Sequence, residues 1–143
     1  WAILYIGLND MEPFNDVYGF VAGDDVLRFT AMVVDEAINE MGSPNDFIGH
    51  VGGGDFIIIT VPQKAEPLRD RVISRFNAEV GAFYSFRDRE RGHVVIKNAS
   101  GSERHAPLMT MSVGVVTDET ADFADIREIT EVAAEARRMS VRK

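Results

Sequence analysis

Three consecutive glycines at positions 52–54 separate two short runs of β-branched and aromatic residues, 47–51 and 56–61. Glycine reaches the positive φ angles of a tight turn without steric cost, and the flanking runs have the composition of β-strands. We therefore predict a β-hairpin whose second strand ends at Pro62. A hairpin is not stable alone, so the rest of the chain must supply further strands and a layer that covers the sheet.

Strand-like and helix-like patterns alternate along the rest of the chain. Residues 1–8 form an almost wholly apolar run, typical of a central strand covered on both faces. The segment 9–19 has the composition of a loop or a short helical turn. Apolar residues recur with helical spacing in three segments, 23–41, 64–80 and 123–139. A second hairpin is expected around 93–108 and a further strand over 109–116.

This order of elements predicts an α+β sandwich of the ferredoxin-like or palm type. The central sheet is mainly antiparallel and flanked by helices, and the hairpin around 93–108 is an addition to it. At 143 residues the chain has the size of a single domain, 1–143. Because it opens directly on a strand-like run at Trp1, with no initiating Met, we expect it to be a fragment of a longer multidomain protein.

Charge and composition exclude several classes of function. The formal net charge of −8 argues against nucleic-acid binding, which needs a basic face, although a small phosphorylated ligand needs only local donors. No apolar run approaches the roughly 20 residues of a membrane-spanning helix, so we expect no membrane insertion by this segment. The absence of cysteine excludes disulfides and thiolate metal sites and fits a cytoplasmic location.

Three stretches carry more information than these patterns. They read NDVYGFVAGD at 15–24, VGGGDF at 51–56 and MSVGV at 111–115. With the helix predicted between the first two, they resemble the GGDEF family of diguanylate cyclases over nearly the whole chain. The resemblance implies the cyclase fold with the signature turn on the first hairpin, and GTP as the family's substrate.

The resemblance also implies where catalytic metal would be held. In active members two GTP-loaded domains face each other, and each 3′-hydroxyl attacks the other's α-phosphate to give cyclic di-GMP, which requires Mg²⁺ on carboxylate oxygens. The family's two metal-binding acids fall on Gly7 and Gly54. What remains is Asp55, in place of the usual Glu, and the Leu8 carbonyl. We expect no catalytic residue, no metal site beyond Asp55 as a weak candidate, and no cofactor, with Mg²⁺ and GTP only if residual binding is retained.

The nucleotide positions implied by the resemblance are partly kept. Asn15 and Asp24 match the residues that read guanine, although both could instead be helix caps, since the first long helix is expected to start near Asp24. Met11 and Glu12 replace the usual Phe-Lys of the phosphate loop, and Glu12 should repel phosphate. In the last helix the family's phosphate-binding Lys falls on Val141.

The product-inhibition motif of the family, R-x-x-D, is also altered. Its Asp is Asp46, but Ser43 stands at the Arg position, so a cyclic dinucleotide lacks its guanidinium anchor. The alternation of Arg with acidic residues over 87–91 predicts a solvated face rather than a docking patch. The three histidines at 50, 93 and 105 are scattered, and we interpret them as structural or surface residues.

These features indicate a catalytically inactive GGDEF domain that acts as a regulatory, nucleotide-sensing or dimerisation module in bacterial cyclic di-GMP-type signalling. Its expected partners are a guanine nucleotide, a second copy of the domain, or other signalling domains. The alternative is an active diguanylate cyclase that converts two GTP to cyclic di-GMP with Asp55, Glu12 or Asp10 as substitute metal ligands.

Overall fold

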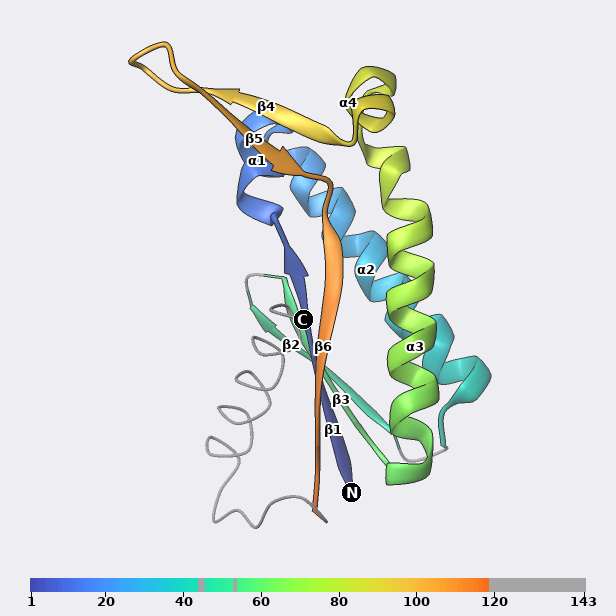
Figure 1. Cartoon of the computed structure of the whole chain (residues 1–143). Coiled ribbons are helices and arrows are strands. Elements are labelled where there is room, and N and C mark those ends of the chain that lie inside the picture. Colours follow the sequence, from blue (N-terminus) through green and yellow to red (C-terminus); the bar gives the residue numbers. More distant parts are fainter. Residues whose placement is uncertain (44–45, 53, 119–143) are drawn as a thin grey trace.

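The computed structural model describes residues 1–43, 46–52 and 54–118, and helices α2 and α3 lie over one face of its main sheet (Figure 1). The elements follow in the order β1 (Ala2–Asn9), α1 (Met11–Tyr18), α2 (Phe20–Met41), β2 (Phe47–Gly52), β3 (Asp55–Thr60), α3 (Pro62–Glu79), a 3₁₀ turn η1 (Val80–Phe83), α4 (Phe86–Arg91), β4 (His93–Lys97), β5 (Glu103–Pro107) and β6 (Thr110–Thr117). The helix predicted over 123–139 lies outside the described residues.

The main sheet has four strands in the order β2-β3-β1-β6, and all of its pairings are antiparallel. The first strand of the chain therefore lies in the middle, between the second strand of the signature hairpin and the last described strand. With α2 and α3 as the two crossovers, this is the βαββαβ arrangement of ferredoxin-like folds. The fold class predicted from the sequence is confirmed, and β4 and β5 form the additional hairpin.

The core lies between this sheet and the two long helices. Alternate residues of β1, such as Leu4 and Ile6, are fully buried against it. Helix α2 contributes Val33 and Val34, and α3 contributes Phe76. Each such side chain stabilises the fold by about 1.5–3 kcal/mol. None of the helices in the described part of the chain has both the length and the apolar character needed to cross a bilayer.

The segment between β1 and α2 is more helical than its composition predicts. Residues Met11–Tyr18 form α1, and α2 already begins at Phe20, before the expected start near Gly23. Gly19, with a φ of 91°, makes the corner between the two helices. Asp24 therefore lies inside α2, and the interpretation of Asp24 as a helix cap is wrong.

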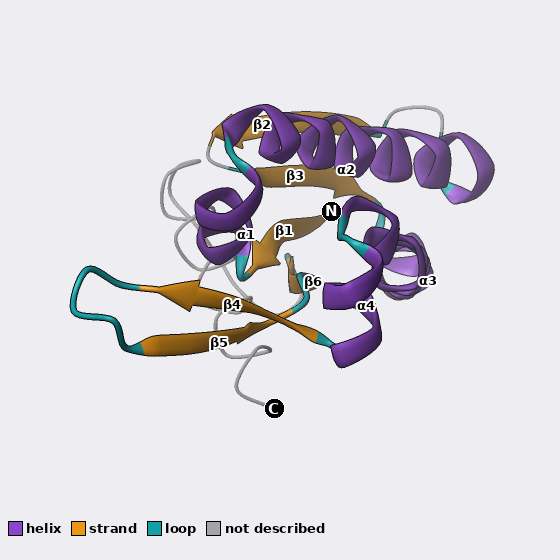
Figure 2. Ribbon diagram, turned by 90° about the horizontal axis from the view of Figure 1, so that it is seen from above, coloured by secondary structure: helices purple, strands orange, loops and turns teal. Residues whose placement is uncertain are grey.

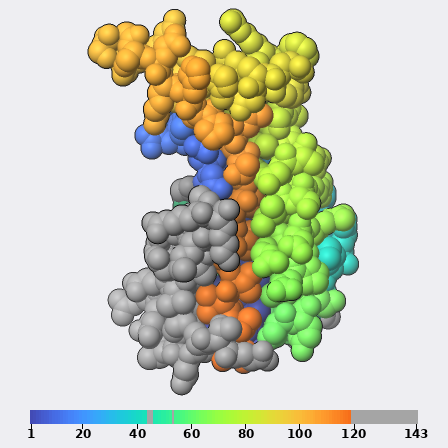
Figure 3. Space-filling view, in the orientation of Figure 1, coloured from blue at the N-terminus to red at the C-terminus, as the bar shows by residue number. Residues whose placement is uncertain are grey.

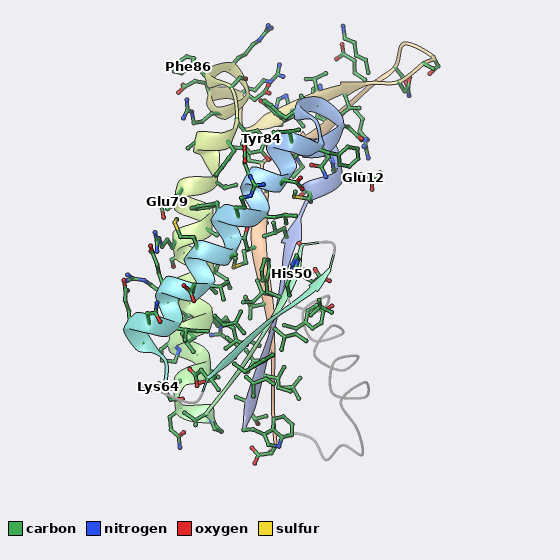
Figure 4. All side chains as sticks on the ribbon, turned by 180° about the vertical axis from the view of Figure 1, so that it is seen from behind. Glu12, His50, Lys64, Glu79, Tyr84 and Phe86 are labelled. Carbon is green, nitrogen blue, oxygen red and sulfur yellow. The ribbon has the colours of Figure 1, made fainter. Side chains whose placement is uncertain are left out.

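Aromatic contacts connect α1 to the segment that precedes β6. The ring of Tyr84 contacts Phe14 and Tyr18, with centroids 5.1 and 5.6 Å apart. The Tyr84 hydroxyl accepts a hydrogen bond from the Met109 amide at 2.8 Å. Figure 4 shows the Tyr84 side chain where α3 approaches α1. Burial raises the pKa of Tyr84 to about 12. The position of α1 thus depends on the added segment, residues 84–109. The β4–β5 hairpin of this segment lies beside α1 in Figure 2.

A second connection joins α1 to α4 through Asp88, which is only 7% exposed. The Tyr18 hydroxyl donates to the Asp88 carboxylate and accepts from the Ser85 amide at 2.9 Å. Arg91 Nη2 donates to Asp88 Oδ1 at 2.5 Å. The hydrogen bond from Tyr18, together with the Arg91 guanidinium, lowers the pKa of Asp88 despite its burial.

The contribution of Asp88 should depend on pH. Folding lowers its pKa from the ordinary 3.8, so near and below pH 3.8 the unfolded chain binds more protons than the folded chain. The free energy of unfolding therefore falls as the pH drops from 3.8 toward the lower pKa of the folded state. We expect Asp88→Asn to destabilise the domain by about 1.5–3 kcal/mol near neutral pH, and the difference from the wild type should shrink as the pH falls below the ordinary pKa of 3.8. Urea unfolding across this range measures it. Asp70→Asn, at a carboxylate that is 69% exposed, is the control, and a pH-independent difference for Asp88→Asn would contradict the assignment.

Candidate functional site

The signature turn between β2 and β3 has a backbone suited to glycine. Gly52 and Gly54 have φ angles of 100° and 93°, in the region that other residues rarely adopt. Gly54 is buried, and a Cβ atom there would lie 3.2 Å from the Leu27 Cδ2 atom. Any carboxylate side chain at position 54 would therefore be strained unless the turn changed its conformation.

Gly7 lies on β1 directly beside this turn. It pairs with Ser112 of β6, and because Ile6 pairs with Phe56, the same register places Gly7 opposite Asp55. Gly7 is buried. The two positions that the resemblance assigns to metal-binding acids are thus brought to one corner of the sheet, and neither carries a side chain.

The remaining signature carboxylate is hydrogen-bonded to a residue that the sequence did not single out. The Tyr5 hydroxyl donates to Asp55 Oδ2 at 3.0 Å, and Tyr5 is 8% exposed. Tyr5 pairs with Ile57, so Asp55 is its diagonal neighbour on the same face, within reach of a long side chain. The sequence signal was the tyrosine two residues before Gly7, which shares its face in a strand.

The residues at this corner do not fit a Mg²⁺ ion, which requires several well-placed oxygen ligands. Across the described ranges, no group of three His, Cys, Asp or Glu side chains is arranged to hold a metal. Of the substitute ligands considered, Glu12 is exposed and points outward from α1 in Figure 4. Asp10 begins α1 with a φ of 64°; burial raises its pKa, while the charge of Arg104 opposes that rise.

The guanine-reading candidates meet at the corner between α1 and α2. Asn15 Oδ1 is buried and has no hydrogen-bond partner within the described part of the chain. It lies 2.0 Å from where a Cβ atom on Gly23 would stand, so this glycine makes room for the amide. Asp24, the next residue, is exposed, and Met11 packs against the same position with its Cε atom at 3.2 Å. The corner therefore holds a buried amide oxygen without a described partner, packed on the residue that precedes an exposed carboxylate.

Asp46, the acid of the altered inhibition motif, is hydrogen-bonded to residues of this chain. Its carboxylate accepts hydrogen bonds from the Ser43 amide at 2.8 Å, from the Ser43 hydroxyl, and from the Thr60 hydroxyl at 2.8 Å. Burial alone would raise the pKa of Asp46, but these hydrogen bonds outweigh it and lower the pKa. The adjacent cleft, about 530 Å³, is lined by the carboxylates of Asp35 and Asp46 and by no basic side chain among the described residues.

The other candidates are dispersed. Leu8 is partly buried and packs against the core. The His50 ring stacks on Phe56, its cross-strand partner, with centroids 4.6 Å apart. Val141, the position that the resemblance assigns to a phosphate-binding Lys, lies outside the described residues. Tyr5 and Gly23 are the two residues that sequence reasoning missed.

Comparisons with known proteins agree with this geometry. The family model described as "Diguanylate cyclase, GGDEF domain" matches residues 1–140. The chain is similar to the GGDEF domain of YfiN from Pseudomonas aeruginosa, with 20% identity, a TM-score of 0.65, and coverage of 99% of this chain and 75% of that one. No protein with a curated description matches it.

Two further solved structures share the fold. The active GGEEF domain of a diguanylate cyclase from Vibrio cholerae has 24% identity and a TM-score of 0.61, with coverage of 96% of this chain and 76% of that one. The GGDEF domain of DgcB from Caulobacter crescentus, in complex with c-di-GMP, has 20% identity and a TM-score of 0.57, with coverage of 99% and 71%.

The contact between Tyr5 and Asp55 can be measured with a double-mutant cycle. We expect Tyr5→Phe to lower the free energy of unfolding by about 1 kcal/mol, because a half-buried carboxylate loses a donor. Combined with Asp55→Ala, the two changes should show a coupling energy of about 0.5–1.5 kcal/mol in urea unfolding. Additive effects would mean that the hydrogen bond does not contribute.

Proposed function

This chain belongs to the GGDEF family of diguanylate cyclase domains, and we propose that it is a non-catalytic member that acts as a nucleotide-sensing, regulatory module in cyclic di-GMP-type signalling. The signature corner carries the proposal. Gly7 and Gly54 supply no carboxylate, the turn at Gly54 has a positive φ, and Tyr5 holds the one acid that is left, Asp55. Losing a single transition-state electrostatic group costs about 2.7–4 kcal/mol, and here two are absent.

The corner at Asn15 supports retained recognition of a guanine base. A buried polar oxygen without a partner costs about 1–3 kcal/mol, and this cost is removed when the amide turns toward a ligand donor. Guanine has N–H donors along one edge, and an amide oxygen and a carboxylate can accept hydrogen bonds from them. The guanine O6 atom can accept a hydrogen bond from the amide nitrogen. Asn15 packs on Gly23, the residue before Asp24, so the amide and the carboxylate come from neighbouring positions of the corner between α1 and α2.

Recognition of the phosphates contributes less. Met11 packs into the corner, and Glu12 directs its charge to solvent, so the described part of the phosphate loop offers no basic side chain. The base should therefore dominate affinity, and without a set of metal ligands Mg²⁺ should add little. In this proposal the domain reports the presence of the nucleotide to a partner, which is a second copy or another signalling domain, without converting it.

Isothermal titration calorimetry tests base recognition. We expect GTP and guanosine to bind with similar affinity, unchanged by Mg²⁺, and Asn15→Ala to weaken both by about tenfold or more, the effect of about 1.4 kcal/mol. Asn39→Ala removes an exposed amide on α2, away from this corner, and is the matched control. Binding that is equally strong in the Asn15 variant would leave only a docking role for the domain.

A cyclase assay tests the loss of catalysis. At high protein concentration with GTP and Mg²⁺ or Mn²⁺, we expect no cyclic di-GMP, also when a fused coiled coil forces the domain to dimerise. A doubly substituted Gly7→Asp, Gly54→Glu chain is the control for the lost acids, although strain at position 54 should limit its recovery. Product formation by the wild type that disappears with Asp55→Ala would establish the alternative, an active enzyme with a substitute ligand.

A further inference from the structure

A cleft separates α1 from α4 and the β4–β5 hairpin, away from the signature turn. Its volume is about 560 Å³, and it is lined by side chains from all four of these elements. Figure 3 shows α4 and the hairpin as a continuous cap above α1. The lining has three basic residues, Arg87, Arg91 and Lys97, against two acidic ones, so it carries a net positive charge in a chain whose net charge is −8.

Helix α4 directs two of these arginines to the cleft. Arg87 and Arg91 are one helical turn apart and therefore share a face, while Asp88 between them turns into the interior. The sequence predicted a solvated face over 87–91, and four of these five residues are exposed, but Asp88 is buried. Arg87 is exposed and, within the described ranges, has neither a hydrogen bond nor an ion pair.

Arg91 is fixed before any ligand arrives. Its Nη2 atom is bound to Asp88 at 2.5 Å, and its Nε atom donates to the His93 carbonyl at 3.0 Å. Asp88 is in turn held by Tyr18. These contacts leave the Nη1 amino group of Arg91 without a described partner, in a fixed orientation. A donor that is already ordered loses less side-chain entropy when it binds a ligand.

The rest of the lining defines the shape of the ligand. Val95 provides an apolar wall on β4, while Ile96, the next residue of the strand, packs against the core. Asp16 and Glu103 add carboxylates, which accept hydrogen bonds from hydroxyl groups. Lys97 is 73% exposed, and its Nζ atom is 4.0 Å from Glu103 Oε1, a distance that leaves the ammonium able to contact another anion.

We propose that this cleft binds a small organic phosphate. The phosphate contacts Arg87, Arg91 and Lys97, whose three charges suit a dianion better than a single carboxylate, and the guanidinium groups match its geometry. The hydroxyl groups of the ligand donate to Asp16 and Glu103, and its carbon skeleton lies on the β4 wall. The site does not depend on guanine binding, because none of its basic residues is part of the corner at Asn15.

Titrations of the full chain with ribose 5-phosphate and with inorganic phosphate, followed by NMR and calorimetry, test this site. We expect ribose 5-phosphate to bind more tightly than inorganic phosphate of equal charge, with shifts in α4, β4 and α1. Arg87→Ala should weaken it about tenfold. Arg89→Ala is the matched control, because Arg89 lies on the same helix but lines a different groove, next to Gly81.

Several results would overturn the proposal. Equal losses in the Arg87 and Arg89 variants would mean that anions are attracted to α4 without a specific site. Equal affinity for ribose 5-phosphate and inorganic phosphate would mean that the acidic and apolar residues of the lining do not recognise the organic part of the ligand. If neither phosphate binds, the cleft is not a phosphate site. Arg87 is exposed and has no described partner, so its substitution leaves folding intact and each outcome is informative.

Discussion

The pairing of β1 with both β3 and β6 is the constraint on which the rest of the structure depends. It pairs the first strand along both of its edges, and the register fixes which of its residues point to the helices and which to the opposite face of the sheet. Because side chains alternate along a strand, a slip of one residue would exchange the two sets. The observed register places Tyr5 and Gly7 beside Asp55, so the chemistry of the corner follows from one strand alignment.

The second organising feature is the attachment of α1. A glycine corner leads into α2, and the side chains of Tyr18 and Tyr84 connect the helix to the added segment. Helix α1 consequently separates two surfaces. One is the corner with the unpaired Asn15 oxygen, and the other is the cleft with Arg87. This one short helix contributes Asn15 to the corner and Asp16 to the cleft.

The sequence predicted the sheet, both hairpins and the two long helices because apolar periodicity and turn residues act locally. This prediction was incomplete at α1, where Asn, Asp and Pro13 suggested a loop or a short helical turn and the structure has a helix of 8 residues. A proline is tolerated in the first turn of a helix, and packing of Phe14 supplies what local propensity lacks. The contact of Tyr5 with Asp55 and the inward turn of Asp88 could not be predicted, because they depend on register and tertiary packing rather than on neighbours in sequence.

The positive φ at Gly54 has an evolutionary consequence. An acid introduced there alone would strain the turn by about 1–3 kcal/mol, and an acid introduced at Gly7 alone would supply only one of the oxygens that a divalent ion requires. Neither step gives an advantage without the other. A descendant could regain metal binding only through an intermediate that carries one acid and is either strained or short of ligands. The backbone of one turn therefore makes the loss of metal binding hard to reverse by single substitutions.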